Sequence, residues 1–334
     1  MNLSGIIRRM PTDTNARSFA NFHSLPSLGD YDLIVVGGGA AGSGAAITAG
    51  RLGLRTLLIE QLSFLGGTGV GSQVTPWMGN QIDLGPLNEG LNAEIQTDLE
   101  ATGDASGYFV NPEAIKFVLE QKAVEAGVTI LFEATVVGIH TSGEQMPELD
   151  GVVIATRQGL RRAQAGAFVD ASGDANVANL AGVPTAEGRE SDRVHQPMSL
   201  RFVLGGIDIP AVERFMLANG PQHTVHRVLG LLNNGPGMEF IKKYAEMGKW
   251  PQKWLDTFTI QLFEIPGRPQ EFWFNCPRIT GHDPLDPLST SKAYIEGRRM
   301  IKAYLELFQR HIGGAADRHS RRPAHSGSLH PHQG

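Results

Sequence analysis

Cysteine is almost absent from this chain, which has only Cys276 among its 334 residues. A single cysteine excludes an internal disulfide and a redox centre of two thiols, and it fits a reducing compartment. Long apolar runs are also absent, because none approaches the roughly 18 residues that a membrane-spanning helix needs. We therefore expect a protein that has no membrane partner.

The chain carries no large excess of charge of either sign. It has 29 basic and 34 acidic residues, a net charge of −5, so it has no global attraction for nucleic acid. Arg8 and Arg9 lie in the polar segment Met1–Leu28, but no apolar stretch of a signal peptide follows them. These observations predict a cytoplasmic protein without a nucleic-acid partner.

Glycine, in contrast, is abundant, and one glycine motif organises the chain. Residues 30–60 read DYDLIVVGGGAAGSGAAITAGRLGLRTLLIE. The pattern predicts a strand over 33–36, a tight turn, a helix to Leu52 and a strand over 56–59. That order is the order of a dinucleotide-binding βαβ unit, within the expected length.

The residues of the motif have separate mechanical roles. Gly37 allows the turn, Gly39 lets a pyrophosphate approach the backbone, and Gly42 lets the helix lie close to the strands. The helix N-terminus offers free N–H groups to phosphates. Glu60 lies 18 residues after Gly42, where a carboxylate can accept hydrogen bonds from a ribose. An acid at this position disfavours NADP.

Two further stretches contain small residues beside expected strand ends. Gly66, Gly67 and Thr68 follow Glu60 closely, and we favour a ligand contact over a plain surface loop for them. An apolar strand over 167–169 runs into the sequence DASGD at 170–174, where backbone can again meet a nucleotide.

The remaining elements decide between two kinds of dinucleotide-binding fold. A helix is predicted near 87–101, and another begins at Asn111-Pro112-Glu113 and ends at Gly127, with an apolar face of Ile115, Val118, Leu119 and Ala123. Strands are predicted over 128–132, 135–140, 152–156 and 161–165. This β-meander replaces a crossover helix, which argues against an NAD-binding dehydrogenase with regular βαβ alternation.

Taken in order, these stretches resemble the FAD-dependent oxidoreductase family with the glutathione-reductase-like FAD fold. The resemblance is carried by VVGGGAAGSGAA, FLGGTGVGS, NPEAIKFVLEQKAVEAGVTILFEATVVGI, FVDASGDANVANLAG and EFWFNCPRITGHDPLDPLSTSKAYIEGRRMI, and it covers about residues 30–310. It implies an α/β fold in which an FAD-binding βαβ/β-meander Rossmann-like domain carries a second α+β cap, or substrate, domain.

The resemblance also implies roles for individual positions. Gly37, Gly39 and Gly42 would hold the FAD pyrophosphate, and Glu60 the AMP ribose. The stretch Gly66, Gly67 and Thr68 would lie along the pyrophosphate or flavin. Val136 would meet the adenine through its backbone. The strand-end residues beside FAD would be Ala171, Ser172, Gly173 and Asp174.

The expected domains follow from this likeness. Residues 1–29 form a disordered lead-in, 30–194 the FAD-binding domain, 195–312 the cap domain and 313–334 a disordered tail. In the cap, strands are expected over 199–205, 257–263 and 270–275, and helices over 210–218 and 289–309.

The chain departs from the family at its C-terminal end. Family members return there to the FAD domain with a strand, a glycine turn and a helix that faces the flavin. Residues 313–334 read GGAADRHSRRPAHSGSLHPHQG and lack apolar periodicity, so we expect a truncated chain. The histidines of this tail are loosely spaced and Asp317 is the one acid or cysteine that joins them, so we favour no metal site over a metal-binding tail.

Candidate catalytic residues are few. His195 and His282 are candidate acid–base groups, and Arg201 is a candidate clamp for a carboxylate. For each of the three we favour the simpler explanation of a hydrogen-bonded surface or hinge residue.

The leading hypothesis is an FAD-dependent oxidoreductase that transfers a hydride between a small organic substrate and the flavin. The alternative is a truncated non-catalytic flavoprotein remnant, or half of a split flavoenzyme. The expected partners are a small-molecule substrate and either a second copy or a complementing chain.

Overall fold

The computed structural model describes residues 21–74, 76–77, 81–82, 85–86, 89–107, 109–143, 148–219, 228–231 and 235–312. The chain packs into two compact units. The first comprises Met1–Val70 and Glu113–Ala186, and the second comprises Gly71–Pro112 and Glu187–Gly334. These units do not decide the functional domain boundaries, which stay a prediction. The expected disordered tail at 313–334 lies outside the described residues.

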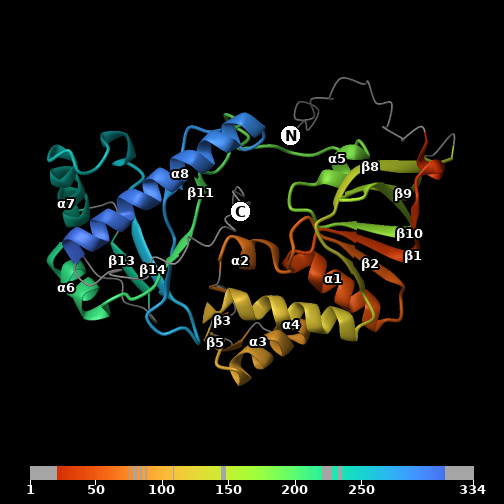
Figure 1. Ribbon diagram of the computed structural model, residues 1–334, viewed down its shortest axis with the longest axis horizontal. Helices are drawn as coiled ribbons and strands as arrows, with labels where there is room; N and C mark the ends of the chain where they lie inside the picture. Colours follow the sequence, from red (N-terminus) through yellow and green to blue (C-terminus); the bar gives the residue numbers. More distant parts are fainter. Residues whose placement is uncertain are drawn as a thin grey trace. The chain divides into compact units, whose positions relative to one another are not determined.

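The first unit is built on a six-stranded sheet in the order β7-β2-β1-β10-β9-β8 (Figure 1). Its strands are β1 (Ser27–Val36), β2 (Thr56–Ile59), β7 (Thr129–Leu131), β8 (Thr135–Ser142), β9 (Glu148–Thr156) and β10 (Gly159–Asp170). Strands β7, β2, β1 and β10 run parallel, whereas β10, β9 and β8 are antiparallel. Both the βαβ unit and the β-meander are therefore confirmed.

One strand differs from the prediction. Residues 161–165 and 167–169 were expected as separate strands, but they belong to the single strand β10. Gly166 does not break the strand, because the register with β1 continues from Ala165 opposite Tyr31 to Ala167 opposite Leu33. The meander therefore runs directly into the DASGD sequence.

Helices of the first unit cover the sheet. Helix α1 (Ala40–Arg51) packs against β1 and β2, and α5 (Asn176–Leu180) packs against β8 and β10. The described part of the chain continues this set with α2 (Gly67–Gly71) and α4 (Pro112–Glu125). The apolar face predicted for α4 is confirmed at Ile115, Leu119 and Ala123, which are all buried.

The expected disordered lead-in is wrong over residues 21–29. These residues include the 3-10 helix η2 (Phe22–Ser24) and the start of β1. Phe22 is only 1% exposed, and its ring stacks on the imidazole of His140 with centroids 4.4 Å apart. A Cβ built on Gly151 would lie 2.3 Å from the Phe22 ring, so the glycine leaves room for it. Burial of this ring fixes the segment on the meander.

The second unit contains a four-stranded antiparallel sheet. Its order is β12 (Phe202–Leu204), β15 (Phe272–Phe274), β14 (Ile260–Glu264) and β13 (Val228–Leu231). A separate pair joins β11 (Met198–Ser199) to β16 (Arg278–Ile279). The single strand predicted over 199–205 is thus wrong, because its start and its end pair with different partners. Two small ribbons join β3 (Gln81–Ile82) to β4 (Gly85–Pro86) and β5 (Ala105–Ser106) to β6 (Phe109–Val110).

The long helix of the second unit has a clear start signal. Helix α8 (Pro287–Leu307) begins after Asp286, whose carboxylate accepts hydrogen bonds from the Leu288 and Ser289 N–H groups. Helices α3 (Gly90–Ala101) and α6 (Ile209–Asn219) agree with expectation, whereas α7 (Gly235–Glu246) and β13 were not predicted. The π-helical segment η4 (Phe308–Ile312) follows α8.

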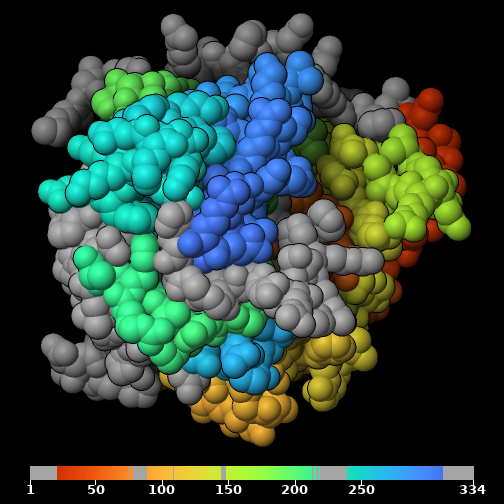
Figure 2. Space-filling view, turned by 60° about the vertical axis from the view of Figure 1, so that its left-hand side comes forward, coloured from red at the N-terminus to blue at the C-terminus, as the bar shows by residue number. Residues whose placement is uncertain are grey.

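One side of the four-stranded sheet carries the apolar core of the second unit. This core includes Phe202, Phe274, Tyr304 and the fully buried Cys276. Figure 2 shows the segment that carries η3 (Gln252–Trp254), in cyan, beside α8, in blue, where Lys253 and Trp254 both bond to Glu296. Within the described part of the chain, no helix combines the length and the apolar character that a bilayer crossing requires.

Replacement of Phe22 tests whether this segment contributes to folding. We expect Phe22→Ala to lower the free energy of unfolding by about 3–5 kcal/mol, because it empties a buried aromatic site. Urea unfolding followed by circular dichroism measures the change, and His23→Ala is the matched control because His23 is exposed. Equal stability of the Phe22 variant and the parent protein would contradict the prediction.

Candidate dinucleotide-binding site

The carboxyl ends of three neighbouring strands meet at one edge of the six-stranded sheet. Val36 at the end of β1 lies opposite Ile59 of β2 and opposite Asp170 of β10. The turns that follow these strands therefore begin side by side. Ligands of open α/β sheets bind outside such strand ends, where the connections leave in opposite directions.

Gly37 makes the turn that leaves β1. Its φ is +97°, a conformation that favours glycine, and its N–H donates to the Ile59 carbonyl at 2.8 Å. A Cβ at this position would lie 2.4 Å from the Ala171 carbonyl oxygen. The first glycine is therefore required by backbone contact between two of the predicted motifs.

Gly42 is required by the close approach of α1 to the same turn. A Cβ on Gly42 would lie 1.8 Å from the Gly37 carbonyl oxygen, which no side chain can tolerate. The N-cap residue of α1 is Gly39, which supplies no side-chain acceptor. The first N–H groups of an α-helix have no partner within the helix, and no cap side chain accepts from those of α1, so they are available to an anion.

Glu60 links the end of β2 to the glycine turn. Its side chain is buried, with 4% exposed. One carboxylate oxygen accepts the Gly38 N–H at 2.5 Å, and the other accepts the Leu62 N–H at 2.7 Å. Because a carboxylate has about four lone-pair sites, acceptors remain for a ribose hydroxyl. The structuring role of Glu60 toward Gly38 was not foreseen from the sequence.

The second glycine pair contacts the first. The Gly66 N–H donates to the Gly38 carbonyl at 2.8 Å. A Cβ on Gly67 would lie 2.7 Å from the Gly39 Cα, so the two backbones touch. Thr68, in α2, is exposed beside them. The structure thus brings together the two stretches that the sequence predicted to share a ligand.

The DASGD turn is held by the carboxylate of Asp170, a residue for which the sequence suggested no role. Asp170 accepts hydrogen bonds from the Ser172 N–H at 3.1 Å and the Ala178 N–H at 2.8 Å. Burial raises the pKa of Asp170, but the hydrogen bonds from Ser172 and Ala178 outweigh it and leave the pKa below 3.8. Gly173 and Asp174 at the tip are exposed. An acid before a serine turn at a strand end is the signal that could have found this anchor.

Val136 lies on β8 with its side chain in the core. It is 6% exposed and belongs to the same apolar cluster as Ile34 and Ile154. Only its backbone is thus left for a ligand. Two residues earlier, the Ala134 N–H donates to the Glu60 carbonyl at 3.1 Å, which ties the start of β8 to the end of β2.

The three candidate catalytic residues all lie in the second unit and have separate partners. His195 approaches Glu187, with nitrogen and oxygen 3.5 Å apart, and His282 approaches Glu296 at 3.0 Å. Hydrogen bonds from His282, Lys253 and Trp254 lower the pKa of Glu296 to about 2. His282 therefore ties its loop to α8. Arg201 is buried and bonds Asn275.

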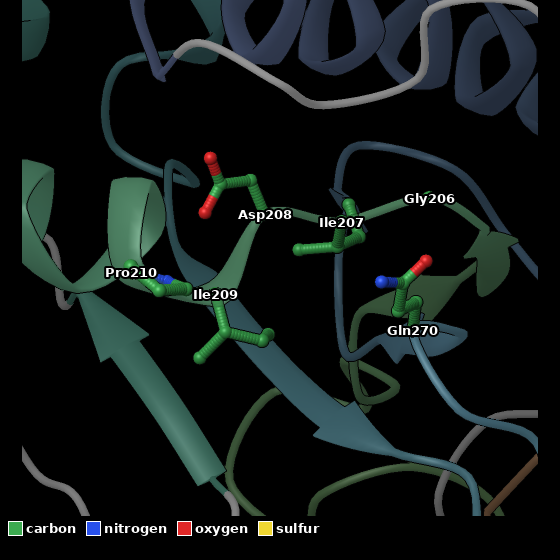
Figure 3. Close-up of a pocket in the computed structure, with 6 residues that line it drawn as sticks. All are labelled: Gly206, Ile207, Asp208, Ile209, Pro210 and Gln270. Carbon is green, nitrogen blue, oxygen red and sulfur yellow. The ribbon is translucent and has the colours of Figure 1, made fainter.

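A hollow of about 280 Å³ lies in the second unit beside the start of α6. Figure 3 shows Ile207 between the side chains of Asp208 and Gln270. The Asp208 carboxylate accepts the Ala211 N–H at 3.1 Å, so it serves to begin the helix. Among the described residues, no group of histidine, cysteine and acidic side chains is placed to hold a metal ion. The histidines of the tail lie outside the described residues.

Fold and site together define a dinucleotide-binding α/β protein with an antiparallel meander. The chain belongs to the FAD-dependent oxidoreductase family, whose model matches residues 32–328. The predicted family and fold class are confirmed, and FAD is the cofactor.

Among curated proteins, the chain is 25% identical to digeranylgeranylglycerophospholipid reductase 1 of Methanococcoides burtonii, over 54% of this chain and 46% of that protein. It is 29% identical to digeranylgeranylglycerophospholipid reductase 2 of Methanothermobacter thermautotrophicus, over 46% and 43%. The chain therefore spans about half the length of the curated relatives it matches. A geranylgeranyl bacteriochlorophyll reductase-like protein of Thermoplasma acidophilum has a similar structure, with a TM-score of 0.46, 15% identity, and coverage of 86% of this chain and 64% of that chain.

Asp170 provides a test of how the turn is held. We expect Asp170→Asn to lower the free energy of unfolding by about 1.5–3 kcal/mol at about pH 7, because it removes a charged acceptor of two N–H groups. The folded-state pKa lies below the ordinary 3.8, so this stabilisation is complete above 3.8 and is lost as pH falls through the folded-state value.

Urea unfolding at about pH 7 and about pH 3 measures the effect, which must shrink at the lower pH. Asp174→Asn is the matched control, since Asp174 lies in the same turn but is exposed. A difference that is equally large at both pH values would show that charge is not the cause.

Proposed function

We propose that the chain is an oxidoreductase that uses its FAD to pass a hydride to or from a small organic substrate. The observation that carries this proposal is the geometry of Gly39. Among the described residues, a Cβ on Gly39 would have one neighbour within 4 Å, the Gly67 Cα at 3.9 Å. Its φ of −66° and ψ of −170° suit any residue. Neither packing nor backbone conformation requires glycine here, whereas a pyrophosphate that lies against the backbone does.

The neighbouring residues suit the rest of the dinucleotide. Gly37 and Gly42 shape the turn, and the N–H groups at the start of α1 would bind the pyrophosphate. Glu60 would accept the ribose hydroxyls of the AMP half. Further contacts along FAD are proposed for Gly66, Gly67, Thr68, Ala171, Ser172, Gly173 and Asp174, with the Val136 backbone at the adenine.

Bound FAD supplies two-electron hydride transfer, and this chain's residues bind and orient it. In the oxidative direction, a substrate C–H bond breaks, its hydrogen leaves with the electron pair as hydride, and one proton of the substrate goes to solvent or a base. In the reductive direction, the substrate gains the hydride and takes up one proton. His195 and His282 already have carboxylate partners, and neither is assigned as that base.

The two curated relatives are named as reductases, which supports a redox reaction on an organic molecule. Because the chain spans about half of each relative, we carry over no lipid substrate. We propose that residues 30–194 act as the FAD-binding domain and 195–312 as the substrate domain, in the cytoplasm. We also propose that the chain associates either with a second copy of itself or with a complementing chain.

Three alanine variants separate the roles of the glycines. We expect Gly39→Ala to fold normally and to weaken FAD affinity at least about tenfold, because the new methyl group points at the cofactor. Gly42→Ala is expected to destabilise the fold by about 1–3 kcal/mol or more through overpacking. Gly44→Ala is the control, since its Cβ would meet nothing within 4 Å. Flavin fluorescence titration and urea unfolding measure the two effects, and unchanged FAD affinity in Gly39→Ala would refute the assignment.

The oxidoreductase proposal has its own test. After addition of FAD and desalting, the purified protein is expected to keep the visible flavin band, and an oxidisable substrate should bleach this band under anaerobic conditions. Protein that takes up no FAD would overturn the proposal for this chain alone. The alternative hypothesis, a non-catalytic remnant or half of a split flavoenzyme, would then lead, and retained FAD that no organic donor or acceptor reduces or reoxidises would favour the remnant.

A further inference from the structure

One face of the four-stranded sheet carries an unusual set of polar and aromatic groups. Because side chains alternate along a strand, Trp273 of β15 and Phe263 of β14 lie on the face opposite to Phe202 and Phe274. Their rings stack, with centroids 4.2 Å apart. Phe109 packs on the same pair and forms a small apolar cluster with them.

Three polar side chains lie in a row at the end of this face. Arg201 directly precedes β12, and its Nε donates to the Asn275 side-chain oxygen at 3.0 Å. The Asn275 amide nitrogen donates in turn to the Gln261 side-chain oxygen at 2.8 Å. Asn275 and Gln261 are half-buried, so the row reaches the surface at that side. The row begins at Arg201, which is 9% exposed.

Two N–H donors on this face have no acceptor in the part of the chain that the structure describes. Nη1 of Arg201 and Nε1 of Trp273 are both buried, and neither has a hydrogen-bond partner among the described residues. The guanidinium carbon lies 4.9 Å from the centre of the Trp273 ring, so the two groups are neighbours. Each unmatched buried donor carries a cost, because it has lost its hydrogen bonds to water and gained none in the protein.

The charge on Arg201 also has no counter-ion in the described part of the chain. None of the ion pairs formed by described residues includes it. Burial lowers the pKa of Arg201 to about 10, which still leaves the guanidinium charged at neutral pH. A buried cation without a counter-ion is rare because the loss of hydration is not repaid. An anion that accepts from both orphan donors would satisfy the charge and the hydrogen bonds together.

We propose that Arg201, Trp273 and Asn275 form a recognition site for the carboxylate of a small organic acid. A planar carboxylate matches the fork of a guanidinium, and its second oxygen can accept from an indole N–H. The Trp273 and Phe263 rings are 1% and 8% exposed and stack on each other, so they make the surroundings of Arg201 apolar and strengthen its attraction for an anion. Combined with the hydride transfer proposed above, on which this last step rests, the site makes a carboxylic acid the substrate.

Benzoate and benzamide make a matched pair of probes, because they share shape and differ in charge. Line broadening of their proton signals on titration with the full-length protein, with and without FAD, reports binding. We expect benzoate to bind and benzamide to bind at least about tenfold more weakly, since the amide cannot replace an anion.

The variants assign the effect to named atoms. Arg201→Met is expected to weaken benzoate affinity at least about tenfold, and Trp273→Phe, which keeps a ring but removes the N–H, by a smaller factor. Arg201→Lys keeps the positive charge but lacks the planar pair of N–H donors of a guanidinium. It provides a second test of the site if the methionine variant does not fold. Arg299→Met is the control because Arg299 is exposed on α8. Circular dichroism verifies that each variant is folded.

Two results would overturn the proposed carboxylate site and leave Arg201 as a structural residue. One is equal affinity for benzoate and benzamide. The other is unchanged benzoate affinity in both folded Arg201 variants. The two proposals fail separately. Loss of benzoate recognition with normal FAD uptake refutes only the carboxylate site. Benzoate recognition by a protein that takes up no FAD supports the site and refutes the flavin-dependent reaction.

Discussion

The first unit depends on contacts between backbones that leave no room for a Cβ atom. Gly37 touches the backbone of residues 171 and 172, Gly42 touches Gly37, and Gly67 touches Gly39. These contacts draw the ends of β1 and β10 and the segment after β2 to one point. The buried carboxylates of Glu60 and Asp170 then fix the turns through backbone N–H groups. The edge of the sheet is thus lined by small residues, which would let the backbone N–H groups of these turns come close to a phosphate-bearing ligand.

Local signals predicted the first unit well. The βαβ unit and the meander follow from residue periodicity and glycine spacing, and the strand over 56–59 has the predicted bounds. Gly166 misled the prediction because a glycine at a strand interior resembles a break, whereas pairing with β1 holds β10 extended. Phe22 was missed because its ordering depends on a distant stacking partner, His140, which no local pattern reveals.

The second unit was harder to predict for a physical reason. Its strands are short, and pairing between distant segments, such as β11 with β16, decides where each begins. The polar face with Arg201 shows the same limit for sites. The sequence marked Arg201 as a candidate carboxylate clamp, but the orphan Trp273 N–H and the row through Asn275 to Gln261 appear only after the strands are in register. When strand register brings the residues of a site together, their spacing along the sequence does not predict the site.

The lone thiol of the chain lies within the core of the second unit. Cys276 is fully buried, and burial raises its pKa, so it has no thiolate to offer in the native state. Alkylation must therefore wait until this part of the molecule opens. The sequence has no second cysteine, so all thiol labelling of the protein comes from Cys276. The rate of labelling therefore measures how often the second unit opens locally, without an engineered probe.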